Sequence, residues 1–128
     1  MATVGEIMSG NLLTVAPDTP IGDVVRLMHE REVGAVLVLD GERLVGIFTE
    51  RDVLHAAATG RLEGKVEDLM SRHPETIEAS DTTGHAAAMM IHGGFRHLPV
   101  EEGGRLAGIV SIRDLMRVVV DDESPRGV

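Results

Sequence analysis

The chain has 128 residues, with 12 Lys and Arg against 21 Asp and Glu, and it contains no cysteine. This length suits one ordinary domain or two half-sized units that share a core. The absence of cysteine excludes disulfides, thiolate zinc sites and a cysteine nucleophile. The net charge of −9 is spread over both halves, and an evenly acidic surface repels nucleic acid and anionic membrane.

The ends of the chain and its apolar runs indicate where the protein resides. The first ten residues have neither a basic start nor an apolar core, so they do not resemble a signal peptide. The longest apolar run, near Ala86–Ile91, is far shorter than the roughly 18 residues that cross a bilayer. We therefore expect a cytoplasmic protein that does not enter a membrane.

The chain opens with a predicted strand and helix. Leu12–Val15 is expected to form a short strand, and Asp18 is a suitable N-cap for the helix that follows, with Pro20 in its first turn. Apolar residues at i, i+3, i+4 and i+7 in Ile21–Met28 predict the buried face of this helix. Gly34 is expected to end it.

A hairpin and a second helix come next. The apolar run Ala35–Leu39 and the return segment Leu44–Phe48 predict two strands, joined at the turn signal Asp40-Gly41. A helix is expected from about Glu50 to Ala58, and Gly60–Gly64 is expected to be a linker.

The second half predicts the same β-α-β-β-α order. The expected elements are a strand at Thr76-Ile77, a helix near Thr82–His92, a strand at Leu98–Val100, a turn at Glu101–Gly104, a strand at Leu106–Val110 and a helix at Arg113–Val120. We therefore expect one repeat over residues 1–62, a second over 63–120 and an acidic tail over 121–128.

The two halves are copies of one sequence. When the chain is shifted by 62 residues, 14 of the 51 pairs that begin with Val4 and end with Leu54 are identical, against about three expected by chance. Neither copy can cover both faces of its own small sheet. The two are therefore expected to pack sheet against sheet about a pseudo-twofold axis, in an α/β fold.

Several motifs of this duplication resemble paired cystathionine-β-synthase (CBS) repeats, the arrangement often called a Bateman module. They are the segments Val4–Ser9 and Val66–Ser71, the threonines Thr14 and Thr76, the stretch Phe95–Val100, and the repeat ends Gly46–Asp52 and Gly108–Asp114. The resemblance covers nearly the whole chain. It implies a homodimeric module that senses AMP, ADP, ATP or S-adenosylmethionine in clefts between the repeats and regulates an attached or separate effector protein.

Thr49-x-x-Asp52 and Ser111-x-x-Asp114 stand where a strand is expected to pass into a helix. A hydroxyl residue followed three positions later by an acidic one predicts a capping box, worth about 1 kcal/mol. The same groups, exposed at a helix N-terminus, can also hold a ribose diol and a phosphate oxygen beside backbone N–H groups. Both roles stay open, because the capping hydrogen bonds can form with or without a bound ligand.

The copies differ in their basic residues, since Arg96 and His97 align with Gly34 and Ala35. The resemblance implies that Arg96, His97 and Arg113 reach the ligand held by the aspartate of the other repeat.

The site on Thr14, Val15, Thr49 and Asp52 would then gain three cationic or protonatable groups, whereas the site on Thr76, Ile77, Ser111 and Asp114 would gain only Arg51. We hypothesise that the Asp52 site is the better phosphate binder. The Asp114 site would prefer a less charged adenosyl ligand or stay empty. The alternative is that Arg96 and Arg113 only form surface ion pairs.

Metal and catalytic chemistry are not indicated. His85 and His92 are seven residues apart, too far for a metal clip at i, i+4, so we expect no metal site. Magnesium would arrive only with a triphosphate. No serine has a G-x-S-x-G setting and no carboxylate pair has a catalytic frame, so we expect no enzymatic activity.

The sequence therefore predicts a stand-alone regulatory module for an adenosine-containing ligand. Its rival is a dimeric interaction scaffold that binds no ligand. The helix containing Ala86–Ile91 is apolar around more than one face. Core packing is the first explanation of that pattern and a dimer surface is the second.

Overall fold

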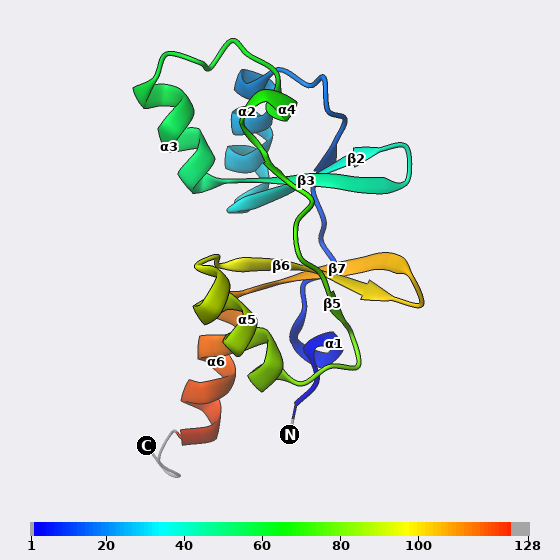
Figure 1. Ribbon diagram of the computed structural model, residues 1–128. Helices are drawn as coiled ribbons and strands as arrows, with labels where there is room; N and C mark the ends of the chain where they lie inside the picture. Colours follow the sequence, from blue (N-terminus) through cyan, green and yellow to red (C-terminus); the bar gives the residue numbers. More distant parts are fainter. Residues whose placement is uncertain (1, 124–128) are drawn as a thin grey trace. The chain divides into compact units, whose positions relative to one another are not determined.

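A computed structural model describes residues 2–123, and these residues form two compact units (Figure 1). Unit A is Leu12–Pro74, and unit B combines Met1–Asn11 with Glu75–Val128. The last helix continues to Glu123, three residues into the stretch expected to be a tail, and residues 124–128 of that stretch lie outside the described part. Among the described helices, none has both the length and the apolar character to cross a membrane.

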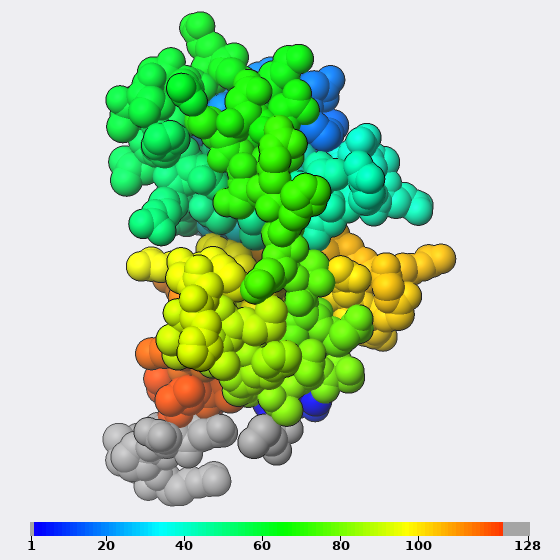
Figure 2. Space-filling view, viewed as in Figure 1, coloured from blue at the N-terminus to red at the C-terminus, as the bar shows by residue number. Residues whose placement is uncertain are grey.

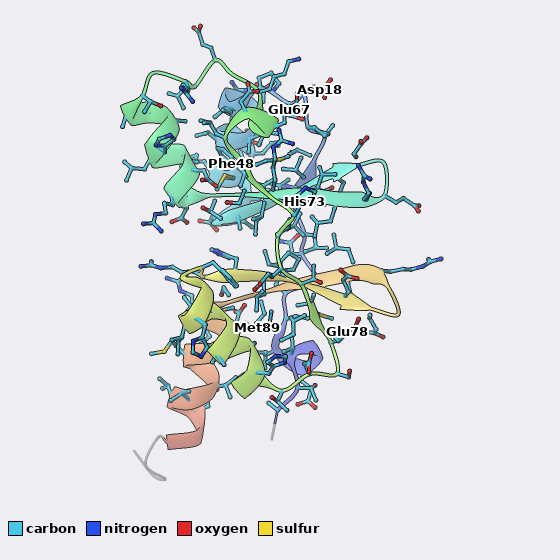
Figure 3. All side chains as sticks on the ribbon, in the orientation of Figure 1. Asp18, Phe48, Glu67, His73, Glu78 and Met89 are labelled. Carbon is cyan, nitrogen blue, oxygen red and sulfur yellow. The ribbon has the colours of Figure 1, made fainter. Side chains whose placement is uncertain are left out.

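Unit A is a four-stranded sheet with helices on one face (Figure 1). Its strand order is β1-β2-β3-β4, with β1 parallel to β2 and the other pairs antiparallel. The elements are β1 (Thr14–Val15), α2 (Ile21–Arg31), β2 (Ala35–Asp40), β3 (Arg43–Thr49), α3 (Glu50–Ala58), α4 (Val66–Leu69) and β4 (Ser71–Arg72). The buried ring of Phe48 lies between β3 and the helices (Figure 3).

Unit B repeats this plan around a sheet of order β5-β6-β7. Its elements are α1 (Val4–Ile7), β5 (Ile77–Glu78), α5 (Thr83–Gly93), β6 (His97–Glu102), β7 (Arg105–Ser111) and α6 (Ile112–Glu123). The β6–β7 hairpin pairs His97 with Ser111, and the β2–β3 hairpin pairs Ala35 with Thr49, at the same register 62 residues earlier. The α/β class and the predicted hairpins are confirmed, and α3 spans the predicted range.

The segment that opens each repeat belongs to the unit built mostly from the other repeat. We call Val4–Ser9 and Val66–Ser71 the lead segments. Val66 and Met70 are buried in the core of unit A, and Val4 is fully buried in the core of unit B. Each core is therefore completed by residues distant in sequence from most of its members.

Each lead segment also pairs with the second hairpin strand of its unit. Ser71 pairs with Ile47 on β3. Ser9 forms an isolated bridge with Ile109 on β7, in which the two N–H···O distances are 2.9 and 3.0 Å. Gly46 on β3 lies directly against Met70. On β7, a Cβ added to Gly108 would lie 2.6 Å from the sulfur of Met8. The glycines allow the lead segments to approach the strands closely.

The prediction that Asp18 caps α2 is wrong. The N-cap is Pro20, which makes no side-chain hydrogen bond, and Asp18 is exposed. The N–H of Ile21 instead donates to the carbonyl oxygen of Gly64 at 2.8 Å. Backbone carbonyls just before the second lead segment satisfy the helix, so the aspartate is not needed.

The other end of α2 also differs from the prediction. Helical geometry stops at Arg31, and Glu32 adopts the left-handed conformation with φ of 54°, so Gly34 lies beyond the cap. The equivalent position after α5 is Gly94, with φ of 71°. Glycine adopts this conformation without the strain that a side chain brings.

Candidate functional site

The first corner of interest lies in unit A, where β3 passes into α3. The backbone N–H of Thr49 donates to Oδ2 of Asp52 at 2.9 Å, and the Thr49 hydroxyl donates to the same oxygen at a long 3.3 Å. The first N–H of the helix, from Glu50, donates to the carbonyl oxygen of Gly34 at 3.1 Å. Among the described residues, Oδ1 of Asp52 has no hydrogen-bond partner.

The equivalent corner of unit B has a reciprocal capping box. The N–H of Ser111 donates to Oδ2 of Asp114 at 2.9 Å, and the N–H of Asp114 donates to the Ser111 hydroxyl oxygen at 3.1 Å. The N–H of Ile112 donates to the carbonyl oxygen of Arg96 at 2.8 Å. The predicted capping box is confirmed at both helices, and in α3 the Thr49 hydroxyl also donates to the carboxylate.

Both aspartates keep one carboxylate oxygen for another partner. Capping occupies Oδ2, while Oδ1 of each side chain accepts no hydrogen bond from residues 2–123. Asp52 and Asp114 are each half-buried, so they are neither sealed in a core nor fully solvated. A carboxylate in this position can accept hydrogen bonds from a pair of adjacent hydroxyls without giving up its cap.

The strand residues predicted for the sites differ in how far their side chains are exposed to a ligand. Thr14 on β1 is exposed and pairs in register with Leu37, while Val15 packs against the core of unit A. Thr76 is half-buried just before β5. Ile77 is 3% exposed within the core of unit B, so only its backbone is available to a ligand.

Three of the four basic residues predicted for the sites belong to one corner of unit B. His97 opens β6 opposite Ser111, Arg96 holds the first turn of α6 through its carbonyl, and Arg113 is exposed within that turn. In the described structure, neither Arg96 nor Arg113 forms an ion pair with a carboxylate. The equivalent corner of unit A carries only Arg51.

The two spaced histidines of the sequence lie beside a shallow hollow on α5. His85 and His92 line this hollow together with Glu75 and Met89. Met89, on α5, is labelled in Figure 3. Nδ1 of His85 lies 3.3 Å from Oδ1 of Asp81. Within residues 2–123, no three His, Asp or Glu side chains gather as a metal-binding cluster.

One part of each corner was not anticipated from the sequence. The carbonyl oxygens of Gly34 and Arg96 receive the first N–H of α3 and α6 and so fix the helix against the preceding strand. Any residue provides a carbonyl, so side-chain identity gives no signal for this role. The hairpin register, with Ala35 opposite Thr49, is what would have located it.

Comparison with known proteins identifies the family to which this duplicated fold belongs. A family profile described as "CBS domain" matches residues 4–59 and 66–121. An uncharacterized 17.7 kDa protein of Acidianus ambivalens is 37% identical over 94% of this chain and 76% of its own length.

Two solved structures share both the fold and substantial sequence identity. A CBS-domain-containing protein from Agrobacterium tumefaciens has a TM-score of 0.86 at 36% identity, covering 92% of this chain and 99% of that one. Arabidopsis thaliana CBSX2, solved in complex with AMP, has a TM-score of 0.83 at 30% identity, covering 96% and 99%. The protein whose two corners are described above is a tandem α/β member of the CBS domain family.

Proposed function

We propose that this protein is a regulatory module that binds an adenosine-containing ligand through the corners at α3 and α6. One observation carries the proposal: two aspartates, 62 residues apart, each cap a helix with one carboxylate oxygen and leave the other unpaired within the described chain. The crystallised complex of the relative CBSX2 with AMP supports this ligand class. AMP, ADP, ATP and S-adenosylmethionine are the candidates.

The free carboxylate oxygen is proposed to accept hydrogen bonds from the ribose hydroxyls. A charge-assisted hydrogen bond contributes about 1.5–3 kcal/mol, whereas micromolar affinity requires about 8 kcal/mol. The aspartate therefore orients the sugar, and adenine burial and phosphate contacts supply most of the affinity. The clefts between the repeats are the proposed location, with Thr14 and Thr76 beside the ligands.

The two sites are proposed to differ in the charge that they accept. Following the family resemblance, Arg96, His97 and Arg113 serve the ligand held by Asp52 and make that site the phosphate binder. The ligand at Asp114 has only Arg51 and carries less charge, or the site stays empty. The lack of carboxylate partners for Arg96 and Arg113 in the described chain supports this assignment over surface ion pairing.

Regulation is proposed to act as a population shift. A ligand that bridges the repeats favours one arrangement by no more than its differential affinity for the two states. The response would be passed to a separate effector protein by a cytoplasmic homodimer. No catalysis is proposed, and magnesium would enter only with a triphosphate.

Calorimetry tests both the ligand class and the assignment of sites. Wild-type protein is titrated with AMP, ADP, ATP and S-adenosylmethionine, and then Asp52→Asn and Asp114→Asn are titrated with each ligand that binds. Asparagine keeps an oxygen for the cap, so these variants remove the charge with little cost to the helix. Phosphorylated ligands should lose about tenfold or more in affinity for Asp52→Asn alone.

Two results would contradict this picture. Loss of nucleotide binding in Asp114→Asn but not in Asp52→Asn would reverse the assignment of the sites. No heat with any ligand would instead favour the rival function, a dimeric scaffold that binds other proteins. Circular dichroism of each variant serves as the folding control.

A further inference from the structure

Unit B is assembled from two stretches of chain that are separated in sequence by the whole of unit A. Its core joins Val4, Ile7 and Met8 of the first lead segment to side chains from residues 75–128. Figure 1 shows α1 among the elements of unit B, although α1 precedes unit A in the chain. The first lead segment is therefore held in unit B by packing and pairing, while its covalent path to residues 75–128 runs through unit A.

The contacts that hold the first lead segment do not depend on this covalent path. The N–H of Val4 donates to the carbonyl oxygen of Asp81 at 2.8 Å. Ser9 pairs with Ile109 through hydrogen bonds of 2.9 and 3.0 Å. Val4 is fully buried, and on the face seen in Figure 2 only a small dark-blue part of the segment is visible. The same segment from a second copy of the chain would form the same contacts.

Two short links join the units, and the second link is strained. Gly10 and Asn11 form the first link, and both are exposed. His73 and Pro74 form the second link, in which His73 has a left-handed backbone with φ of 52°. This conformation is unfavourable for a residue with a side chain, and a residue before proline favours an extended backbone instead.

We propose that unit B of one copy accepts the first lead segment of a second copy, in a reciprocal domain swap. Both copies regain the same buried contacts, so the free-energy cost is limited to association and to the new conformation of the links. Opening of the second link allows His73 to adopt an extended backbone, which releases its strain and favours the swap. The homodimer of the proposed function requires no swap, so the two modes of association are independent.

The second lead segment is expected to stay in its own copy. The carbonyl oxygens of Leu62 and Gly64, just before this segment, accept the N–H groups of Gly22 and Ile21. A swap of the second lead segment would also break these hydrogen bonds. Unit A is moreover a continuous stretch of chain, so its core closes without a segment from elsewhere.

A pair of introduced cysteines reports which copy the first lead segment joins, because the natural chain has no cysteine. Ser9 and Ile109 exchange both backbone hydrogen bonds, and Cα atoms in such a pair lie about 5.5 Å apart, which a disulfide can span. Ser9→Cys/Ile109→Cys is refolded from urea at low and high protein concentration, oxidised, and run on a denaturing gel without reductant. The covalent dimer should increase with protein concentration.

The equivalent pair in unit A is the matched control. Ser71→Cys/Ile47→Cys joins residues at the same register, and its disulfide should stay within one chain at every concentration. A mixture of Ser9→Cys chains and Ile109→Cys chains tests the swap without a double variant. Mass spectrometry should find more of the mixed disulfide dimer when the two are refolded together than when folded proteins are mixed.

The strain in the second link is tested by His73→Gly in the background of the Ser9→Cys/Ile109→Cys pair. Glycine adopts the left-handed conformation without strain, so the association constant of the swapped dimer should fall about fivefold or more. Disulfides that stay within one chain at every concentration, together with no mixed dimer, would overturn the swap. Equal amounts of covalent dimer from the two cysteine pairs would overturn its restriction to unit B.

Discussion

Two glycines of the second repeat illustrate how one substitution can have opposite effects. Gly84 lies in the first turn of α5 with its nearest potential contact at 3.9 Å, whereas Gly94 ends that helix with φ of 71°. Gly84→Ala should stabilise the protein by up to about 1 kcal/mol, because alanine loses less backbone entropy on folding. Gly94→Ala should destabilise it by about 1–2 kcal/mol, because alanine is strained in the left-handed region.

Urea denaturation of the two alanine variants measures both effects on the free energy of unfolding. The pair serves as its own control, since each variant adds a single methyl group. Equal effects of the same sign would contradict the assignment of Gly94 to a left-handed cap.

Local chemistry explains which residue roles could be predicted. The capping box of Ser111 and Asp114 lies within four residues, and it is formed as the spacing predicts. Asp18 is also a residue type that favours N-caps, but it does not cap α2, because the carbonyl oxygen of Gly64, distant in sequence, accepts the N–H of Ile21 instead. A cap can be predicted only where no distant backbone group takes its place.

Among the elements, the contacts of the lead segments with their strands differ between the units. The three atoms nearest to a Cβ at Gly46 all belong to the side chain of Met70, whereas a Cβ at Gly108 would also lie 2.8 Å from the carbonyl oxygen of Ser9. Either Gly→Ala change should cost about 1–3 kcal/mol. Met70→Ala should largely relieve the clash at Gly46, while Met8→Ala should leave the backbone clash at Gly108.

Double-mutant cycles for the two glycine–methionine pairs test this prediction by chemical denaturation. The coupling energy between Gly46 and Met70 should exceed that between Gly108 and Met8. Equal coupling energies would indicate that the backbone near Ser9 shifts to accept the new methyl group.

The elements that the sequence predicted are those with a local signature. The hairpins have continuous apolar runs and turn glycines, and α3 follows a capping motif. The four-residue helices α1 and α4 and the two-residue strand β4 were not expected, because they are too short to show a period. They are held by pairing with residues far away in the chain, which no local window includes.

For the whole molecule, the lead segments predict which unit a core substitution will weaken. Val4 and Val66 are equivalent, fully buried residues, but Val4 packs in unit B and Val66 in unit A. Val4→Ala should lower the opening free energy of amides in residues 75–121 by roughly 2 kcal/mol. Val66→Ala should do the same for residues 12–59.

Native-state hydrogen exchange measures the two opening free energies. Each variant is the control for the other. If Val4→Ala instead weakened residues 12–59 selectively, the first lead segment would pack within its own repeat.

The repeated order of predicted elements was enough to predict the α/β class, and the motifs that resemble CBS repeats were enough to predict the family. Which segments of the chain make up each compact unit was not predictable in this way. The offset shows which residues are equivalent, but it does not show which partner each lead segment joins.

The exchange of lead segments also has a consequence for biosynthesis. Unit A is a continuous stretch, Leu12–Pro74, so its core can close once that stretch has left the ribosome. Unit B requires Val4 together with Leu115, so a segment translated before unit A must wait for one translated after unit A before it can be buried. Until then, the apolar side chains of Val4, Ile7 and Met8 stay exposed ahead of unit A, which makes this segment a target for a chaperone.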